Sequence, residues 1–212
     1  MPSLLGIVVL AALLRFTTLD VQSYWFDETV TVVDVLRPSL LATIERVPSQ
    51  ELAPPLYSAL AWLWSRPFGA GEVGLRSLSA LLGTAIVPVA YAAARRLATQ
   101  RAGLIAAALV ATNPLLVWYS QEARHYSLLA LMAAATVLCF ARALREPSRA
   151  ALWWWAAACA GALATHYFAA FLIAPEAIWL LWASRRRPAA TLLAAGAVAA
   201  VGAALLLSLI HI

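Results

Sequence analysis

The sequence has no lysine and little charge of either sign. Charged residues make up 12% of its 212 residues and hydrophobic residues 64%, and the mean hydropathy is +0.82. This composition excludes a soluble globular domain and indicates a polytopic membrane protein. The net charge of +5 would suit a nucleic-acid-binding protein, but all fifteen basic residues are arginines, most of them in short runs between apolar segments. Because such runs are typical of membrane topology, we expect no nucleic-acid partner.

Cysteine and alternating polar patterns are scarce as well. Cys139 and Cys159 both lie in apolar segments without metal-ligand spacing, so we interpret them as small buried hydrophobic residues. The long Ala, Leu and Val segments also differ from the short alternating strands of a membrane barrel. The sequence therefore predicts an all-α fold, a polytopic membrane helix bundle of about six or seven transmembrane helices.

Seven apolar segments are expected to cross the membrane. They are residues 3–19, 76–94, 102–118, 128–141 with flanks, 152–165, 168–184 and 189–207. The first has neither a basic leading region nor a credible cleavage site, so we interpret it as an uncleaved anchor.

Residues 20–75 form a large first loop with structure of its own. Seven of the ten acidic residues lie here, among Pro, Gly and short apolar runs. Residues 28–36 could form a short interfacial helix, although the β-branched run 29–33 would suit a strand by propensity. Residues 56–68 are too short to span at about 1.5 Å per residue, so we place them in the interface. The Ala-Pro-Pro sequence at 53–55 is expected to end one element and start the next.

The arginines predict the orientation. Three connections, around Arg95, Arg145 and Arg186, hold nine of the fifteen arginines and alternate with the acidic loop and two polar islands, 119–126 and 165–167. Arginine-rich connections are cytoplasmic. We therefore expect an integral protein of the cell (inner or plasma) membrane whose acidic loop and polar islands share the extracytoplasmic face.

The segment Tyr24-Trp25-Phe26-Asp27-Glu28 is the candidate active site. Tyr and Trp favour the headgroup level of a membrane, so Asp27 and Glu28 should lie just outside the hydrocarbon, where they can ionise. There they can meet a substrate that is half in lipid and half in water, such as a sugar on a lipid phosphate. The alternative is that two acidic residues at the start of a helix only cap it and favour its dipole.

Five motifs occur in an order that is similar to a known family. They are residues 24–28, 53–57, 75–83, 119–128 and 165–167. Over residues 1–206 the chain resembles the N-terminal part of a GT-C superfamily membrane glycosyltransferase of the family 39 type, which includes protein O-mannosyltransferases and the lipid A aminoarabinose transferase. Such enzymes often have His before the Pro pair, where this chain has Ala53.

The resemblance implies a reaction on the outer face of the membrane. A polyprenyl-phosphate sugar would be the donor, and the acceptor a hydroxyl on a protein, lipid or glycan. We expect Asp27 to act as general base in a single, inverting displacement, with Glu28 orienting the acceptor or binding a cation. Asp27, Glu28 and His166 are consistent with Mg²⁺ or Mn²⁺ but do not require either.

Further polar residues are expected to bind substrate. Arg124 is the first candidate for the phosphate, since a guanidinium forks onto phosphate oxygens; its alternatives are an ion pair with Glu122 or an interfacial anchor. Arg76 is a second candidate, equally well explained as an anchor, and His125 and His166 could bind substrate or metal. The expected set is completed by Tyr57, Gln121, Glu122 and Tyr126.

The sequence also leaves two other functional classes open and suggests a truncated chain. A transporter or flippase for lipid-linked sugars would concentrate polar residues at mid-membrane, where only Glu176 lies deep, and a scaffold would leave Asp27 and Glu28 incidental. Family members usually have more helices and often a C-terminal outer domain, so we expect an N-terminal fragment that is inactive alone. Residues 207–212 resemble the translation of a transposon end used in sequencing libraries, so we expect a non-native tail and no role for His211.

Overall fold

The computed structural model describes residues 2–51, 53–183 and 188–210. It is 84% helical, and the described ranges contain no strand, which confirms the predicted all-α membrane bundle. The helices are α1 (Pro2–Phe16), α2 (Phe26–Val35), α3 (Leu40–Glu51), α4 (Leu56–Phe68), α5 (Glu72–Leu97), α6 (Gln100–Thr112), α7 (Pro114–Tyr119), α8 (Tyr126–Arg145), α9 (Arg149–Thr165), the 3₁₀ turn η1 (Tyr167–Ala169), α10 (Ala170–Ala183) and α11 (Pro188–Ile210).

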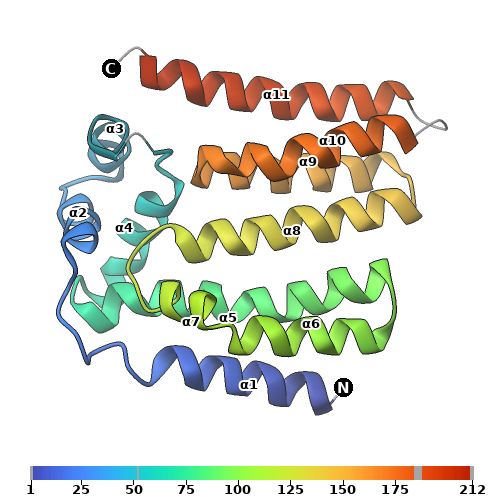
Figure 1. Ribbon diagram of the computed structural model, residues 1–212. Helices are drawn as coiled ribbons and strands as arrows, with labels where there is room; N and C mark the ends of the chain where they lie inside the picture. Colours follow the sequence, from blue (N-terminus) through green and yellow to red (C-terminus); the bar gives the residue numbers. More distant parts are fainter. Residues whose placement is uncertain (1, 52, 184–187, 211–212) are drawn as a thin grey trace.

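The long helices run side by side (Figure 1). By length and composition, three of them are long and apolar enough to cross a membrane: α5, α8 and the Pro188–Leu207 part of α11. Shorter apolar helices lie at Ser3–Phe16 in α1, at Gln100–Thr112 in α6 and at Tyr167–Ala183, which joins η1 to α10. The predicted spans therefore correspond to helices of unequal length.

The two ends of the bundle differ in composition. The α5–α6 and α8–α9 connections, with Arg95, Arg96, Arg145 and Arg149, lie at one end, whereas α2, α3 and α4 gather at the other (Figure 1). We call the second end the loop end. The α7–α8 and α9–α10 connections also reach the loop end, so the sequence correctly predicted that these segments converge. The Arg185–Arg187 connection and His211 lie outside the described residues.

The predicted continuous span 102–118 is instead two helices, α6 and α7. Pro114 lacks an N–H and would clash with the preceding turn of a continuous helix, so α6 ends and a new helix begins with Pro at its first position and the Asn113 side chain as cap. The last carbonyl groups of α6 accept hydrogen bonds from a side chain of another helix. The buried Arg15 guanidinium of α1 donates to the carbonyls of Val110 and Ala111, at 3.1 and 2.9 Å.

The segment with the β-branched run is a helix, α2, and tertiary contacts explain why. Its buried face carries Glu28, Thr31, Asp34 and Val35, which is helical spacing. Asp34 accepts a hydrogen bond from Ser58 of α4 at 3.2 Å and forms an ion pair with Arg46 of α3 at 3.2 Å. These contacts join α2, α3 and α4 into one unit and override the strand propensity of the run.

Glu176 lies deep in the bundle, where a charge without partners would be costly. Its carboxylate is hydrogen-bonded there. Its carboxylate accepts hydrogen bonds from the Trp155 indole at 2.8 Å and from the Thr136 hydroxyl at 3.2 Å. It thereby links α10 to α9 and α8. These contacts give Glu176 a structural role in the bundle.

Candidate active site

The first turn of α2 separates the two adjacent carboxylates. Successive residues of a helix point about 100° apart, so one side chain can face the protein while the next faces outward. Glu28 is 0% exposed, whereas Asp27 is exposed. The two acidic residues therefore lie in different environments and do not act as one pair.

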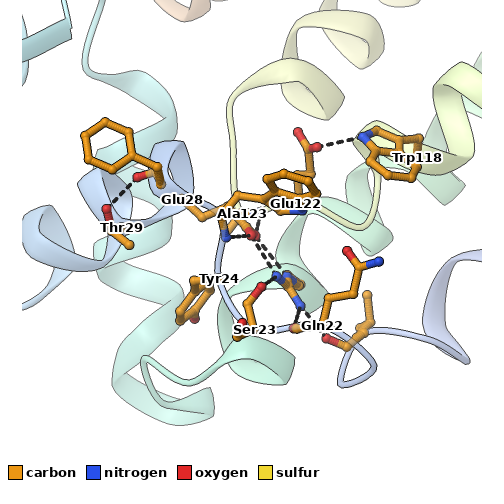
Figure 2. Close-up of polar contacts among 12 residues, drawn as sticks. Gln22, Ser23, Tyr24, Glu28, Thr29, Trp118, Glu122 and Ala123 are labelled. Atoms are coloured by element: carbon orange, nitrogen blue, oxygen red, sulfur yellow. Dashed lines mark hydrogen bonds and ion pairs between the residues drawn. The ribbon is translucent and has the colours of Figure 1, made fainter.

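Glu28 is held by a buried ion pair with Arg76 of α5. The Glu28 carboxylate accepts from Arg76 Nε at 2.9 Å and from Arg76 Nη2 at 2.7 Å. It also accepts from the backbone N–H groups of Ala123 at 2.8 Å and Trp25 at 3.0 Å. Figure 2 shows Glu28 and Ala123 at the centre of this network. Glu28 thus joins α2 to α5 and to the loop before α8, and it caps its own helix.

The Arg76 guanidinium has no donor left for a phosphate. Besides its two bonds to Glu28, it donates to the carbonyls of Leu19, Gln22 and Ser23. These five contacts match its five N–H groups. This differs from the substrate-binding role expected for Arg76, and it makes Arg124 the arginine to consider for the donor.

The ion pair also determines the charge state of Glu28. Burial by itself raises its pKa, but the hydrogen bonds from Arg76, Ala123 and Trp25 and the charge of Arg76 together bring the pKa below its usual value. Since the folded-state pKa is lowered, the pair stabilises the fold above the ordinary pKa of 4.5, and this stability is lost as the pH falls through the lowered value.

Asp27 lines a cavity at the loop end together with Arg124. This Asp27 cavity has a volume of about 250 Å³. The Arg124 Nη1 group donates to the backbone carbonyl of Asp27 at 3.1 Å, so the guanidinium and residue 27 are neighbours although 97 positions separate them. The lining residues are Trp25, Phe26, Asp27, Glu28, Trp118, Glu122 and Arg124.

Glu122 is a further carboxylate of this cavity and, unlike Glu28, is not held by an arginine in an ion pair among the described residues. It accepts a hydrogen bond from the Trp118 indole at 2.7 Å (Figure 2). Burial and the negative charges of Glu28 and Asp27 raise the pKa of Glu122. Trp118 was not predicted as a site residue. Trp118 lies in α7 and Glu122 in the loop that follows it, so the available signal was only their closeness in the sequence.

The two candidate histidines lie together. The rings of His125 and His166 are 5.0 Å apart between centroids, and Tyr126 lies 4.6 Å from His125. His125 is only 8% exposed, and its Nε2 has no hydrogen-bond partner among the described residues. Burial, the Arg124 charge and His166 lower its pKa to about 3. His125 is therefore a neutral imidazole at physiological pH.

The low pKa of His125 predicts acid sensitivity. Below the ordinary pKa of 6.5 the unfolded chain binds a proton that the folded chain does not, so stability falls as the pH falls. Between pH 6.5 and 5 the loss should be about 2 kcal/mol. Thermal unfolding in detergent measures it: His125→Phe should flatten this pH dependence, and His166→Phe should change it less because His166 is more exposed. Equal pH slopes in wild type and His125→Phe would contradict the assignment.

Tyr57 lies in the core beneath the cavity. Its hydroxyl is within 2.9 Å of the Ser79 hydroxyl, and Ser79 in turn donates to the Arg124 carbonyl at 3.4 Å. Burial raises the pKa of Tyr57, so its hydroxyl stays protonated. In this structure Tyr57 supports the backbone of Arg124 and does not line the Asp27 cavity.

Gln121 and Tyr126 flank the cavity on other sides. The Gln121 amide donates to the Leu14 carbonyl at 2.9 Å and to the Thr18 hydroxyl at 2.6 Å, which joins its loop to the end of α1. The Tyr126 ring packs against Tyr119 at 4.4 Å between centroids. Both residues are at the loop end, as predicted, but outside the Asp27 cavity.

The expected metal ligands are not assembled. Within residues 2–51, 53–183 and 188–210, no group of three or more His, Cys, Asp or Glu side chains is placed to hold a metal ion. Glu28 is engaged by Arg76, and His166 lies beside His125. These side chains do not fit a three-ligand site in the described residues, and binding of Mg²⁺ or Mn²⁺, which the sequence allows but does not require, stays a prediction.

The sequence of this helical chain also matches a known family. The dolichyl-phosphate-mannose-protein mannosyltransferase family matches residues 53–211, well over half of the chain. The chain belongs to this family. It is therefore a glycosyltransferase of the mannosyltransferase type, and its three candidate spans agree with an integral membrane protein. No curated protein and no solved structure gives a significant match.

Membership of the mannosyltransferase family favours a transferase over the transporter and the scaffold. The matched range includes Arg76, Arg124, His125 and His166, and it begins after Asp27 and Glu28. The roles of these two acidic residues therefore depend on the geometry described above.

Proposed function

We propose that this chain transfers a sugar from a polyprenyl-phosphate donor to an acceptor hydroxyl, with Asp27 as general base and Arg124 as phosphate ligand. The observation that carries the proposal is that these two side chains line one cavity of about 250 Å³. Glycosyl transfer from a lipid phosphate needs a base for the acceptor hydroxyl and a cation for the departing phosphate, and this cavity is lined by one of each. The family description, which names a dolichyl-phosphate-mannose donor and a protein acceptor, agrees with that chemistry.

The reaction follows from the two groups. An Asp27 carboxylate oxygen takes the proton of the acceptor hydroxyl while the acceptor oxygen forms a bond to the anomeric carbon. The bond from that carbon to the phosphate oxygen breaks, and the polyprenyl phosphate leaves with the electron pair. The Arg124 guanidinium stabilises the charge of the departing phosphate. A single displacement of this kind inverts the anomeric configuration.

Arg124→Ala is expected to weaken donor binding by roughly 10- to 100-fold, because a hydrogen bond to a charged group contributes about 1.5–3 kcal/mol. Arg124→Lys should recover only part of the affinity, since an ammonium cannot form two parallel bonds. The measurement is binding of a polyprenyl-phosphate sugar to the chain in nanodiscs. Arg101→Ala, an exposed arginine at the opposite end, is the matched control. Unchanged affinity in a folded Arg124→Ala protein would remove Arg124 from the mechanism.

We also propose that the loop end faces outward. The described arginine-rich connections lie at the opposite end of the bundle (Figure 1), and such connections are cytoplasmic. In a cysteine-free background, Val21→Cys should react with an impermeant maleimide on intact cells and Gln100→Cys should not; both positions are exposed. The reverse labelling pattern would place the Asp27 cavity on the cytoplasmic side and exclude an extracytoplasmic reaction.

A further inference from the structure

A second polar cavity lies beside the Asp27 cavity. It has a volume of about 200 Å³, and its walls include Thr18, Gln22 and Gln121; we call it the Gln22 cavity. Trp25, Trp118 and Glu122 line both cavities. The two cavities therefore adjoin and share part of their walls.

The Gln22 cavity offers no cationic donor to a ligand. Arg76 is the single cation among its described lining residues, and its five N–H groups are engaged by Glu28 and three carbonyls. Glu122 adds a carboxylate to the wall. An anionic group in this cavity would thus meet negative charge without a compensating partner, which is unfavourable. The phosphate of the donor does not fit here.

The remaining lining groups suit a neutral or cationic peptide. The Gln22 amide carries both donors and an acceptor, and the Gln121 amide, whose NH₂ group is bonded to Leu14 and Thr18, adds a carbonyl oxygen. Together they can pair with peptide N–H and C=O groups. Trp25 and Trp118 are 53% and 50% exposed. Their indole faces can pack against aliphatic side chains and attract Lys or Arg through cation–π contacts.

We propose that the Gln22 cavity binds the acceptor as a peptide segment with a Ser or Thr hydroxyl and uncharged or cationic neighbours, and that Glu122 discriminates against acidic neighbours. This inference rests on the proposed function, because the Ser or Thr side chain of the bound peptide would extend past the shared residues into the Asp27 cavity, where Asp27 takes the hydroxyl proton. Glu122 is a specificity-determining residue in this arrangement. Its carboxylate is held in place by the Trp118 indole at 2.7 Å (Figure 2).

The test measures binding and needs no sugar transfer. Three fluorescent nonapeptides carry a central Thr flanked by Ala, Lys or Asp residues, and their affinity for the chain in nanodiscs is measured by anisotropy. The Lys peptide should bind at least as tightly as the Ala peptide, and the Asp peptide about tenfold more weakly at low salt. Glu122→Gln keeps an oxygen acceptor for Trp118 and should bring the Asp peptide within about twofold of the Ala peptide. Glu45→Gln, which changes an exposed acid elsewhere in the loop, should leave the tenfold difference between the Asp and Ala peptides unchanged.

A second variant tests the location of the site. Gln22 is exposed, and its side chain makes no hydrogen bond to the described residues, so Gln22→Ala should fold normally yet weaken all three peptides. Equal affinity for the three peptides in wild type, or a preference that persists in Glu122→Gln, would overturn the proposal. Binding of methyl mannoside, with no binding of any of the three peptides, would overturn it in favour of a carbohydrate acceptor. Donor binding to Arg124 variants is measured separately, so the failure of either proposal can be distinguished from the failure of the other.

Discussion

An Arg76→Ala protein is expected to lose about 3–5 kcal/mol of folding free energy, the usual consequence of removing one partner from a buried ion pair. Glu28 would remain 0% exposed with a charge that has lost its guanidinium. The carbonyls of Leu19, Gln22 and Ser23 would lose their donor as well. The segment of the loop that leads into α2 should therefore be the first part of the chain to unfold.

Thermal unfolding in detergent at pH 7 measures this loss. Arg101→Ala, which removes an exposed arginine, should shift the melting temperature little. The double variant Glu28→Met with Arg76→Met should be more stable than either single variant, because no buried charge is left unpaired. Arg76→Ala with the melting temperature of Arg101→Ala would show that the ion pair does not stabilise the fold.

Asp27→Asn is expected to lower turnover by about 10²-fold or more, the scale on which a general base contributes. Asparagine keeps the size and hydrogen bonding of the side chain but cannot take the acceptor proton. Because Asp27 is exposed and outside the buried network, melting temperature and donor affinity should stay close to wild type. Initial rates with a polyprenyl-phosphate sugar measure the effect, and Asp20→Asn, an exposed Asp in the same loop, is the control. Full turnover by Asp27→Asn would show that Asp27 is not the general base and only occupies the first turn of α2.

The arrangement of the bundle was predictable from charge and hydropathy alone. The arginine runs alternate with the acidic loop and the polar islands, so simple counting placed Asp27, Arg124 and His166 at the same end. The structure has this convergence, with His125 and His166 5.0 Å apart between centroids. The break between Asn113 and Pro114 could also be predicted, since Pro ends a helix at the preceding residue. The capping of the end of α6 by Arg15 of another helix could not be predicted.

The partners within the site could not be deduced from the sequence. Glu28 and Arg76 are 48 positions apart, and several arginines could have served Glu28 equally well. Helical geometry indicates that adjacent carboxylates point in different directions. This argues against Asp27 and Glu28 acting together on one substrate. The pairing of Glu122 with Asp27 in one cavity depends on how the loop before α8 packs on α2, which no local pattern specifies.

A single-turnover assay would show whether Asp27 acts as the general base for sugar transfer in the Asp27 cavity. Donor labelled in the sugar is bound first, acceptor is added at saturation, and the rate of label transfer is followed for folded, donor-loaded protein. Asp27→Asn should bind donor normally and transfer label about 10²-fold more slowly than wild type or Asp20→Asn. Transfer by Asp27→Asn at the wild-type rate would contradict this role of Asp27.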